Sequence, residues 1–149
     1  MYKKHKIVIA VTSIMVFIVS YLFKCDYKAL ASDSITIISI SLAIYMTSFS
    51  GLISSDLAKE MKNKSDGQMP WKSELGVLKG YIFSAVVAAI ISIAVACIIL
   101  VVNDRIDSAI RPGKLYYALS SLGFCSLSVN FCFMFFLFKF MTNRQLWSK

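Results

Sequence analysis

The stretch DLAKEMKNKSDGQMPWKSELGVLK, residues 56–79, decides how this chain is organised. It is the only extended polar run among 149 residues. On each side of it lie two long uncharged stretches, and a short polar segment separates the two members of each pair. The sequence therefore has the order hairpin, polar linker, hairpin.

The uncharged stretches are long enough to cross a bilayer. They cover residues 7–23, 34–55, 80–103 and 115–138, and a spanning helix needs about 20 apolar residues. The chain is 58% hydrophobic and 16% charged, whereas a soluble domain is about a quarter charged. We therefore expect a single all-α integral membrane domain, with four transmembrane helices arranged as two hairpins.

The distribution of Lys and Arg predicts the orientation. The N-terminus, the linker 56–79 and the C-terminal tail share one side of a four-span protein and hold eleven of the 16 basic residues. The other side holds five, while the acidic residues divide four and four. The positive-inside rule then places both termini and the linker in the cytoplasm, and we expect a bacterial inner membrane.

Small residues recur every fourth position in the second and third stretches. Such residues let helix backbones approach closely in lipid. We expect these two stripes to pack on each other within one subunit; the alternative is that one of them forms a subunit interface or lines a pore. Their members are Ser39, Ala43, Thr47, Gly51 and Ser55 in the second stretch, and Gly80, Ser84, Ala88, Ser92 and Ala96 in the third.

The linker has its own local pattern. Residues 56–64 contain no helix breaker, so we expect them to continue the second helix into water. Residues 71–79 carry apolar side chains at helical spacing and predict a short interfacial helix, with Trp71 at headgroup level. Membrane topology and anionic lipid explain most of the linker lysines. A sharper hypothesis is that four of them, with Trp71, bind a nucleotide, a nucleic acid or a protein partner: Lys59, Lys62, Lys64 and Lys72.

Several function classes are disfavoured. No Asp, Glu, Lys, Arg or His lies inside a predicted span, which argues against an ion-coupled transporter. His5 is the only histidine, at an N-terminus that we expect to be loose, and the four cysteines form no C-x-x-C pair. We therefore expect no enzyme activity, no metal site and no cofactor.

Asn130 is the one carboxamide deep inside a predicted span. It can bond to a neighbouring helix of the same subunit, or it can bond across subunits or ring a pore. A hydrogen bond between membrane helices is worth about 1 kcal/mol in any of these cases, so both interpretations stay open.

The size and the layout of four uncharged stretches around a basic linker resemble the small four-span membrane proteins of bacterial anti-phage systems, such as the membrane effector of the Hailong system and the membrane subunit of Kiwa. The resemblance concerns overall architecture, and no functional residue is carried over from it. It implies a homo-oligomer that answers a cytoplasmic signal or partner.

These observations lead to two functional expectations. The first is an ion-channel-like or membrane-perturbing effector, gated from its basic cytoplasmic face and acting in antiviral defence. The alternative is a non-conducting membrane anchor, sensor or immunity protein that binds a partner through residues 56–79.

Overall fold

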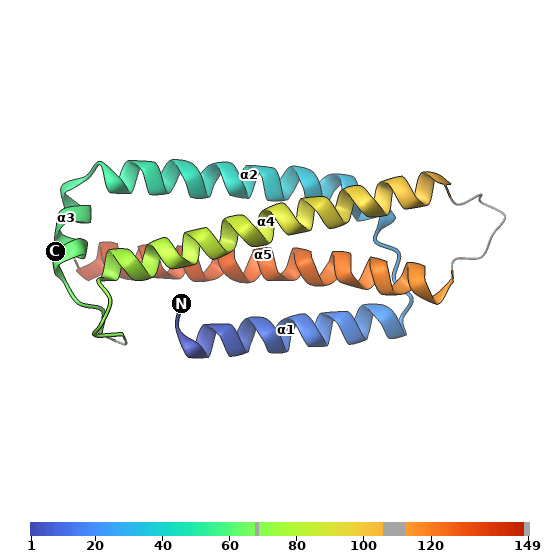
Figure 1. Cartoon of the computed structure of the whole chain (residues 1–149), viewed down its shortest axis with the longest axis horizontal. Coiled ribbons are helices and arrows are strands. Elements are labelled where there is room, and N and C mark those ends of the chain that lie inside the picture. Colours follow the sequence, from blue (N-terminus) through green and yellow to red (C-terminus); the bar gives the residue numbers. More distant parts are fainter. Residues whose placement is uncertain (68, 106–112, 148–149) are drawn as a thin grey trace.

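The computed structural model describes residues 1–67, 69–105 and 113–147, with side chains described throughout except at 57, 103–105 and 143–147. Five helices follow one another along the chain: α1 (Lys3–Leu22), α2 (Lys28–Ile53), α3 (Asp56–Asn63), α4 (Glu74–Arg105) and α5 (Lys114–Trp147). The four long helices lie roughly along one axis, and α3 lies across one end (Figure 1). We call this end, which also holds the N-terminus and the segment 64–73, the linker end.

Helices α1, α2, α4 and α5 are each long and apolar enough to cross a membrane. The expectation of an all-α chain with four such helices is therefore confirmed. Three helices extend well beyond the predicted stretches, because α2 begins at Lys28, α4 begins at Glu74 and α5 continues to Trp147. The connector expected at 104–114 falls largely on residues 106–112, which lie outside the described residues.

The helices are packed in the order α1, α5, α4, α2 (Figure 1). Helix α5 packs against α1 on one side and α4 on the other, while α2 packs on α4 and touches α5 less extensively. Within the described residues, α1 and α2 do not pack on each other. The expected first hairpin is therefore wrong as a packing unit, because α1 finds its partner in α5 rather than in its neighbour along the chain.

The buried face of α4 explains its central position. Seven of its buried residues are spaced alternately four and three apart: Leu78, Ile82, Ala85, Ala89, Ser92, Ala96 and Ile99. This spacing averages 3.5 residues, close to the 3.6 of a helical turn, so the residues form a nearly straight row along one face. Small residues in the middle of the row allow α2 and α5 to approach the α4 backbone closely.

The end of α1 is held by a tight reversal of the chain. The amide N–H of Lys24 donates to Tyr21 O at 3.2 Å, and that of Cys25 donates to Ser20 O at 3.0 Å. This pair of bonds is the Schellman motif, which places one residue in the left-handed region. Here that residue is Lys24, with φ of 50°.

The structure corrects both expectations for the linker. Helix α2 ends at Ile53, and Ser55 is extended with ψ of 157°, so residues 56–63 form the separate helix α3 instead of continuing α2. No separate interfacial helix is present at 71–79, because α4 starts at Glu74 and runs directly into the span. Trp71 lies before α4 and is 76% exposed.

Candidate functional site

The linker lysines gather at one end of the molecule. Lys59 and Lys62 lie on α3, Lys64 follows it, and Lys72 lies in the turn before α4; all four are exposed. Trp71 is exposed beside Lys72. The structure thus brings the sequence-predicted binding residues to one end of the molecule, where all five are exposed.

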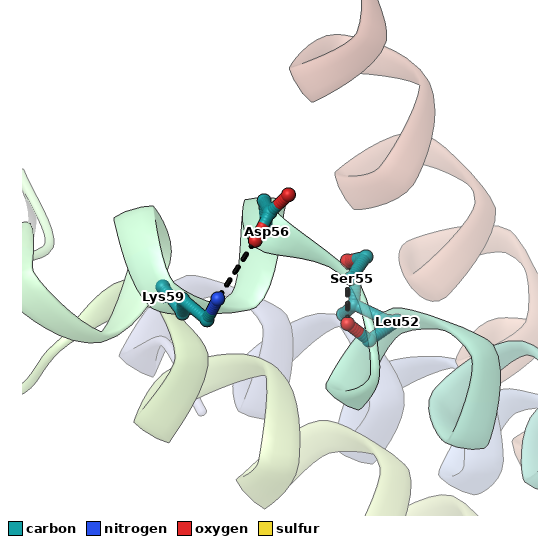
Figure 2. A network of polar contacts seen from close by, with 4 residues as sticks. All are labelled: Leu52, Ser55, Asp56 and Lys59. Atoms are coloured by element: carbon teal, nitrogen blue, oxygen red, sulfur yellow. Dashed lines mark hydrogen bonds and ion pairs between the residues drawn. The ribbon is translucent and has the colours of Figure 1, made fainter.

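The corner between α2 and α3 shows how this end is built (Figure 2). The Ser55 hydroxyl donates to Leu52 O at 2.6 Å, back toward α2, so it does not cap α3. Asp56 instead lies in the first turn of α3, where a negative charge interacts favourably with the helix dipole. Lys59 Nζ lies 2.8 Å from Asp56 Oδ1, which leaves the charge of Lys59 partly compensated.

The segment 64–73 is a compact loop rather than an open linker. Ser65 and Ser73 form an antiparallel bridge, and the Glu74 N–H donates to Lys64 O at 3.1 Å. Asp66 lies inside the loop at 5% exposure and accepts the Met69 N–H on Oδ1 at 2.8 Å. A buried carboxylate with these backbone contacts fixes the loop conformation.

The N-terminus is fastened to this loop. The Tyr2 hydroxyl donates to Asp66 Oδ2 at 2.5 Å, and the Tyr2 N–H donates to the Tyr81 hydroxyl of α4 at 3.1 Å. The Tyr81 hydroxyl also lies 2.6 Å from His5 Nδ1, and the His5 ring stacks on Phe136 of α5 at 4.1 Å between centroids. The expectation of a loose N-terminus is therefore wrong.

The charges around the first residue reflect this packing. Burial lowers the pKa of the Met1 ammonium below its usual value, and the positive charges of Lys72 and Lys6 lower it further. Asp66 acts in the opposite direction. The N-terminal amine therefore lies within the electrostatic reach of the linker, although sequence reasoning did not connect the two.

We call Tyr2, His5, Asp66, Tyr81 and Phe136 the linker clamp. It joins the loop 64–73 to α1, α4 and α5 through bonds between residues up to 79 positions apart in sequence. Sequence reasoning missed all five residues. One feature of the sequence could have pointed to them: Tyr2, His5 and Tyr81 lie at the ends of apolar stretches. At a membrane interface, the hydroxyl groups and ring nitrogens of such side chains can form hydrogen bonds while the rings stay in apolar surroundings.

Asn130 forms its hydrogen bonds within one subunit. It is 5% exposed, and its Nδ2 donates to Ser92 Oγ of α4 at 2.6 Å and to Ser126 O at 2.9 Å. Its Oδ1 has no hydrogen-bond partner among the described residues. Of the two interpretations left open, the bond to a neighbouring helix of the same subunit is present.

The two small-residue stripes do not face each other. The stripe members Ser39, Ala43, Thr47 and Gly51 of α2 are exposed, and Ser55, which lies after the end of α2, is half-buried. The buried face of α2 instead carries Ala31, Ser34, Ile38, Ser41 and Tyr45. In α4, Ser92 and Ala96 lie in the buried row, and Gly80, Ser84 and Ala88 are half-buried beside it. The expectation that the stripes pack together within one subunit is therefore wrong for α2.

No family, curated protein or solved structure matches this chain. Within the described residues, no group of three His, Cys, Asp or Glu side chains could hold a metal ion. The linker end thus combines exposed ammonium groups with a loop that the linker clamp joins to α1, α4 and α5.

Proposed function

We propose that this chain is a channel-like or membrane-perturbing effector that assembles from several copies and is gated from its linker end. The observation that carries the proposal is the exposed face of α2, which carries Ser39, Ala43, Thr47 and Gly51 and packs on no other described helix. Copies that meet through this face would approach closely. Hydroxyl groups lining such a contact can replace water around a passing ion.

The linker clamp supports gating from the linker end. An anion bound by the exposed lysines of α3 and the loop would act on Asp66 and Tyr2, whose bonds reach Tyr81 on α4 and, through His5, Phe136 on α5. A ligand that binds one arrangement of this clamp more tightly shifts the population toward that arrangement. We further propose that the linker end faces the cytoplasm of a bacterial inner membrane and that the activity serves anti-phage defence, as the architectural resemblance implies.

Ion flux through reconstituted protein tests the conduction. We expect single-channel currents from the full chain in planar bilayers, reduced by Thr47→Leu because the substitution removes a hydroxyl from the exposed face of α2. Met46→Leu is the matched control, since Met46 is also exposed on α2 but carries no hydroxyl. A bilayer that stays sealed with the full chain under every ligand tried would refute the proposal.

A second experiment tests the ligand. ATP and oligothymidylate serve as a nucleotide and a nucleic-acid probe, and the triple variant Lys59→Gln, Lys62→Gln, Lys64→Gln removes three positive charges. We expect the response of the current to either probe to be lost in this variant while membrane insertion is kept. If the current of the variant responded to ATP or oligothymidylate as the wild type does, these lysines would not bind a polyanion that gates the protein.

The alternative function is a non-conducting anchor, sensor or immunity protein that binds a protein partner through residues 56–79. The observation that favours it is Trp71, whose large side chain is 76% exposed next to Lys72. Tryptophan is enriched where protein interfaces have their strongest contacts. Capture of a partner that is lost in Trp71→Ala, together with an absence of ion flux, would select this alternative.

A further inference from the structure

An apolar groove of about 460 Å³ opens between α2, α4 and α5 in the half of the span next to the linker end. Its wall runs from Ile44 to Leu52 on α2 and from Phe131 to Met141 on α5, with Leu78 and Ile82 of α4 at the base. It exists because α2 and α5 both pack on α4 but touch each other little. Its size lies within the range of small-ligand pockets, about 300–1,000 Å³.

The wall offers almost nothing to a polar ligand. Of the described residues that line the groove, only Ser48 and Tyr45 carry a polar side chain, and Tyr45 is 6% exposed. The Tyr45 hydroxyl is buried and has no hydrogen-bond partner among the described residues. The other eleven lining side chains are apolar, so the groove favours a hydrocarbon chain over water.

The length of the groove identifies the kind of hydrocarbon. Met141 lies ten positions after Phe131 on α5, which corresponds to about 15 Å along a helix. This is half of the roughly 30 Å hydrocarbon core of a bilayer, or one leaflet. One lipid chain of the leaflet at the linker end fits this length.

The charge at the mouth of the groove identifies the headgroup. The groove opens beside Leu52, directly before the corner that leads into α3. Residues 1–6 and 56–79, which lie at this end, carry eight Lys against four Asp and Glu, and Lys62 and Lys64 are exposed. Each lysine near the surface attracts anionic lipid by about 1 kcal/mol.

We propose that the groove between α2, α4 and α5 binds one anionic phospholipid, with an acyl chain along Tyr45 and the phosphate at the lysines of the linker end. The bound chain supports α2 against α5 where the two helices fail to meet. This inference does not depend on conduction, and its test involves no ion flux, so its failure is separable from that of the proposed function.

The test is native mass spectrometry of the full chain in detergent, with phosphatidylglycerol or phosphatidylcholine of identical acyl chains as probes. Ser48→Phe places a ring in the groove, and Ser50→Phe is the matched control because Ser50 is exposed and does not line the groove. We expect retained phosphatidylglycerol on the wild type and on Ser50→Phe, and about tenfold less on Ser48→Phe, which corresponds to about 1.4 kcal/mol. Phosphatidylcholine should be retained less well than phosphatidylglycerol on the wild type.

A second pair of variants keeps the test decisive if Ser48→Phe does not fold. Ile44→Trp lies on the rim of the groove at 50% exposure, and Ile40→Trp is its control at 56% exposure outside the groove. Equal retention of phosphatidylglycerol by Ile44→Trp and Ile40→Trp would overturn the acyl-chain site. Equal retention of the two phospholipids by the wild type would overturn the anionic headgroup.

Discussion

The ring of Tyr27 lies directly against Gly123: a Cβ atom on Gly123 would come within 2.5 Å of Tyr27 Cδ1. Tyr27 precedes α2 and is fully buried, with its hydroxyl donating to Ser34 Oγ at 2.7 Å. The ring also meets Phe124 edge to face at 5.0 Å. The start of α2 is thus anchored on α5 by one aromatic ring that only glycine admits at this distance.

Gly123→Ala should destabilise the fold. The new methyl group cannot avoid the Tyr27 ring, so the ring or a backbone must move, at a cost of about 1–3 kcal/mol. The measurement is the unfolding of the full chain in detergent, followed by helicity. Gly80→Ala is the control, because a Cβ there meets nothing within 4 Å and alanine favours the helix by roughly 0.5–1 kcal/mol. Equal stabilities of the two variants would contradict the contact.

The bond between Asn130 and Ser92 should give a measurable coupling between α5 and α4. In a double-mutant cycle of Asn130→Ala and Ser92→Ala, we expect a coupling energy of about 0.6 kcal/mol, the average for hydrogen bonds between membrane helices, and at most about 1.7 kcal/mol. A cycle of Asn130→Ala with Ser128→Ala is the control, since the Ser128 hydroxyl donates to Cys125 O within its own helix. A coupling near zero in the first cycle would mean that the bond adds no stability.

Lys24→Gly should stabilise the turn after α1. Lys24 has φ of 50°, in the left-handed region that costs a residue with a Cβ roughly 1–2 kcal/mol and costs glycine nothing. We expect a gain in the free energy of unfolding of about 1 kcal/mol, since glycine also loosens the unfolded chain. Lys79→Gly, at an exposed position of α4, should lose about 1 kcal/mol. If both variants lowered the free energy of unfolding, residue 24 would not be held in the left-handed conformation.

The sequence predicts the spanning helices well and their packing faces poorly, and the reason is geometric. Length and the absence of charge are sufficient to recognise α1, α2, α4 and α5. A row with a repeat of four residues, however, drifts by about 40° per step around a helix of 3.6 residues per turn. The stripe from Gly80 to Ala96 therefore turns across α4 and enters its contact face only at Ser92 and Ala96, while the straight row uses the alternating four–three spacing.

The candidate site was predictable only in part. Exposed lysines at the linker end follow directly from charge counting, and the structure places Lys59, Lys62 and Lys64 there. The clamp could not be foreseen, because Tyr2 meets Asp66 and Tyr81 only after α1 has packed on α5 instead of α2. Periodicity along one segment carries no information about such long-range pairs.

Tyr2→Phe should loosen the loop 64–73. The substitution keeps the ring and removes only the hydroxyl that donates to Asp66, a bond to a buried carboxylate worth about 1.5–3 kcal/mol. We expect trypsin to cleave after Lys64 and Lys72 at least about tenfold faster, because cleavage follows the population of the opened loop. Tyr21→Phe, at an exposed position of α1, should leave the rate unchanged. Identical rates in the wild type and Tyr2→Phe would show that the hydroxyl does not hold the loop.

The exposed face of α2 should join copies of the chain. A Cβ atom on Gly51 would meet nothing within 4 Å in one subunit, and Thr47 is exposed one turn before it. A single subunit therefore tolerates Gly51→Leu, whereas two copies that approach through this face would be held apart by the larger side chain. We expect the variant to shift the assembly toward monomers in light scattering of the detergent-solubilised chain, with affinity lowered at least about tenfold. Ala94→Leu, which enlarges an exposed small residue on α4, should leave the mass unchanged. If Gly51→Leu assembles as the wild type does, the face of α2 is in contact with lipid alone.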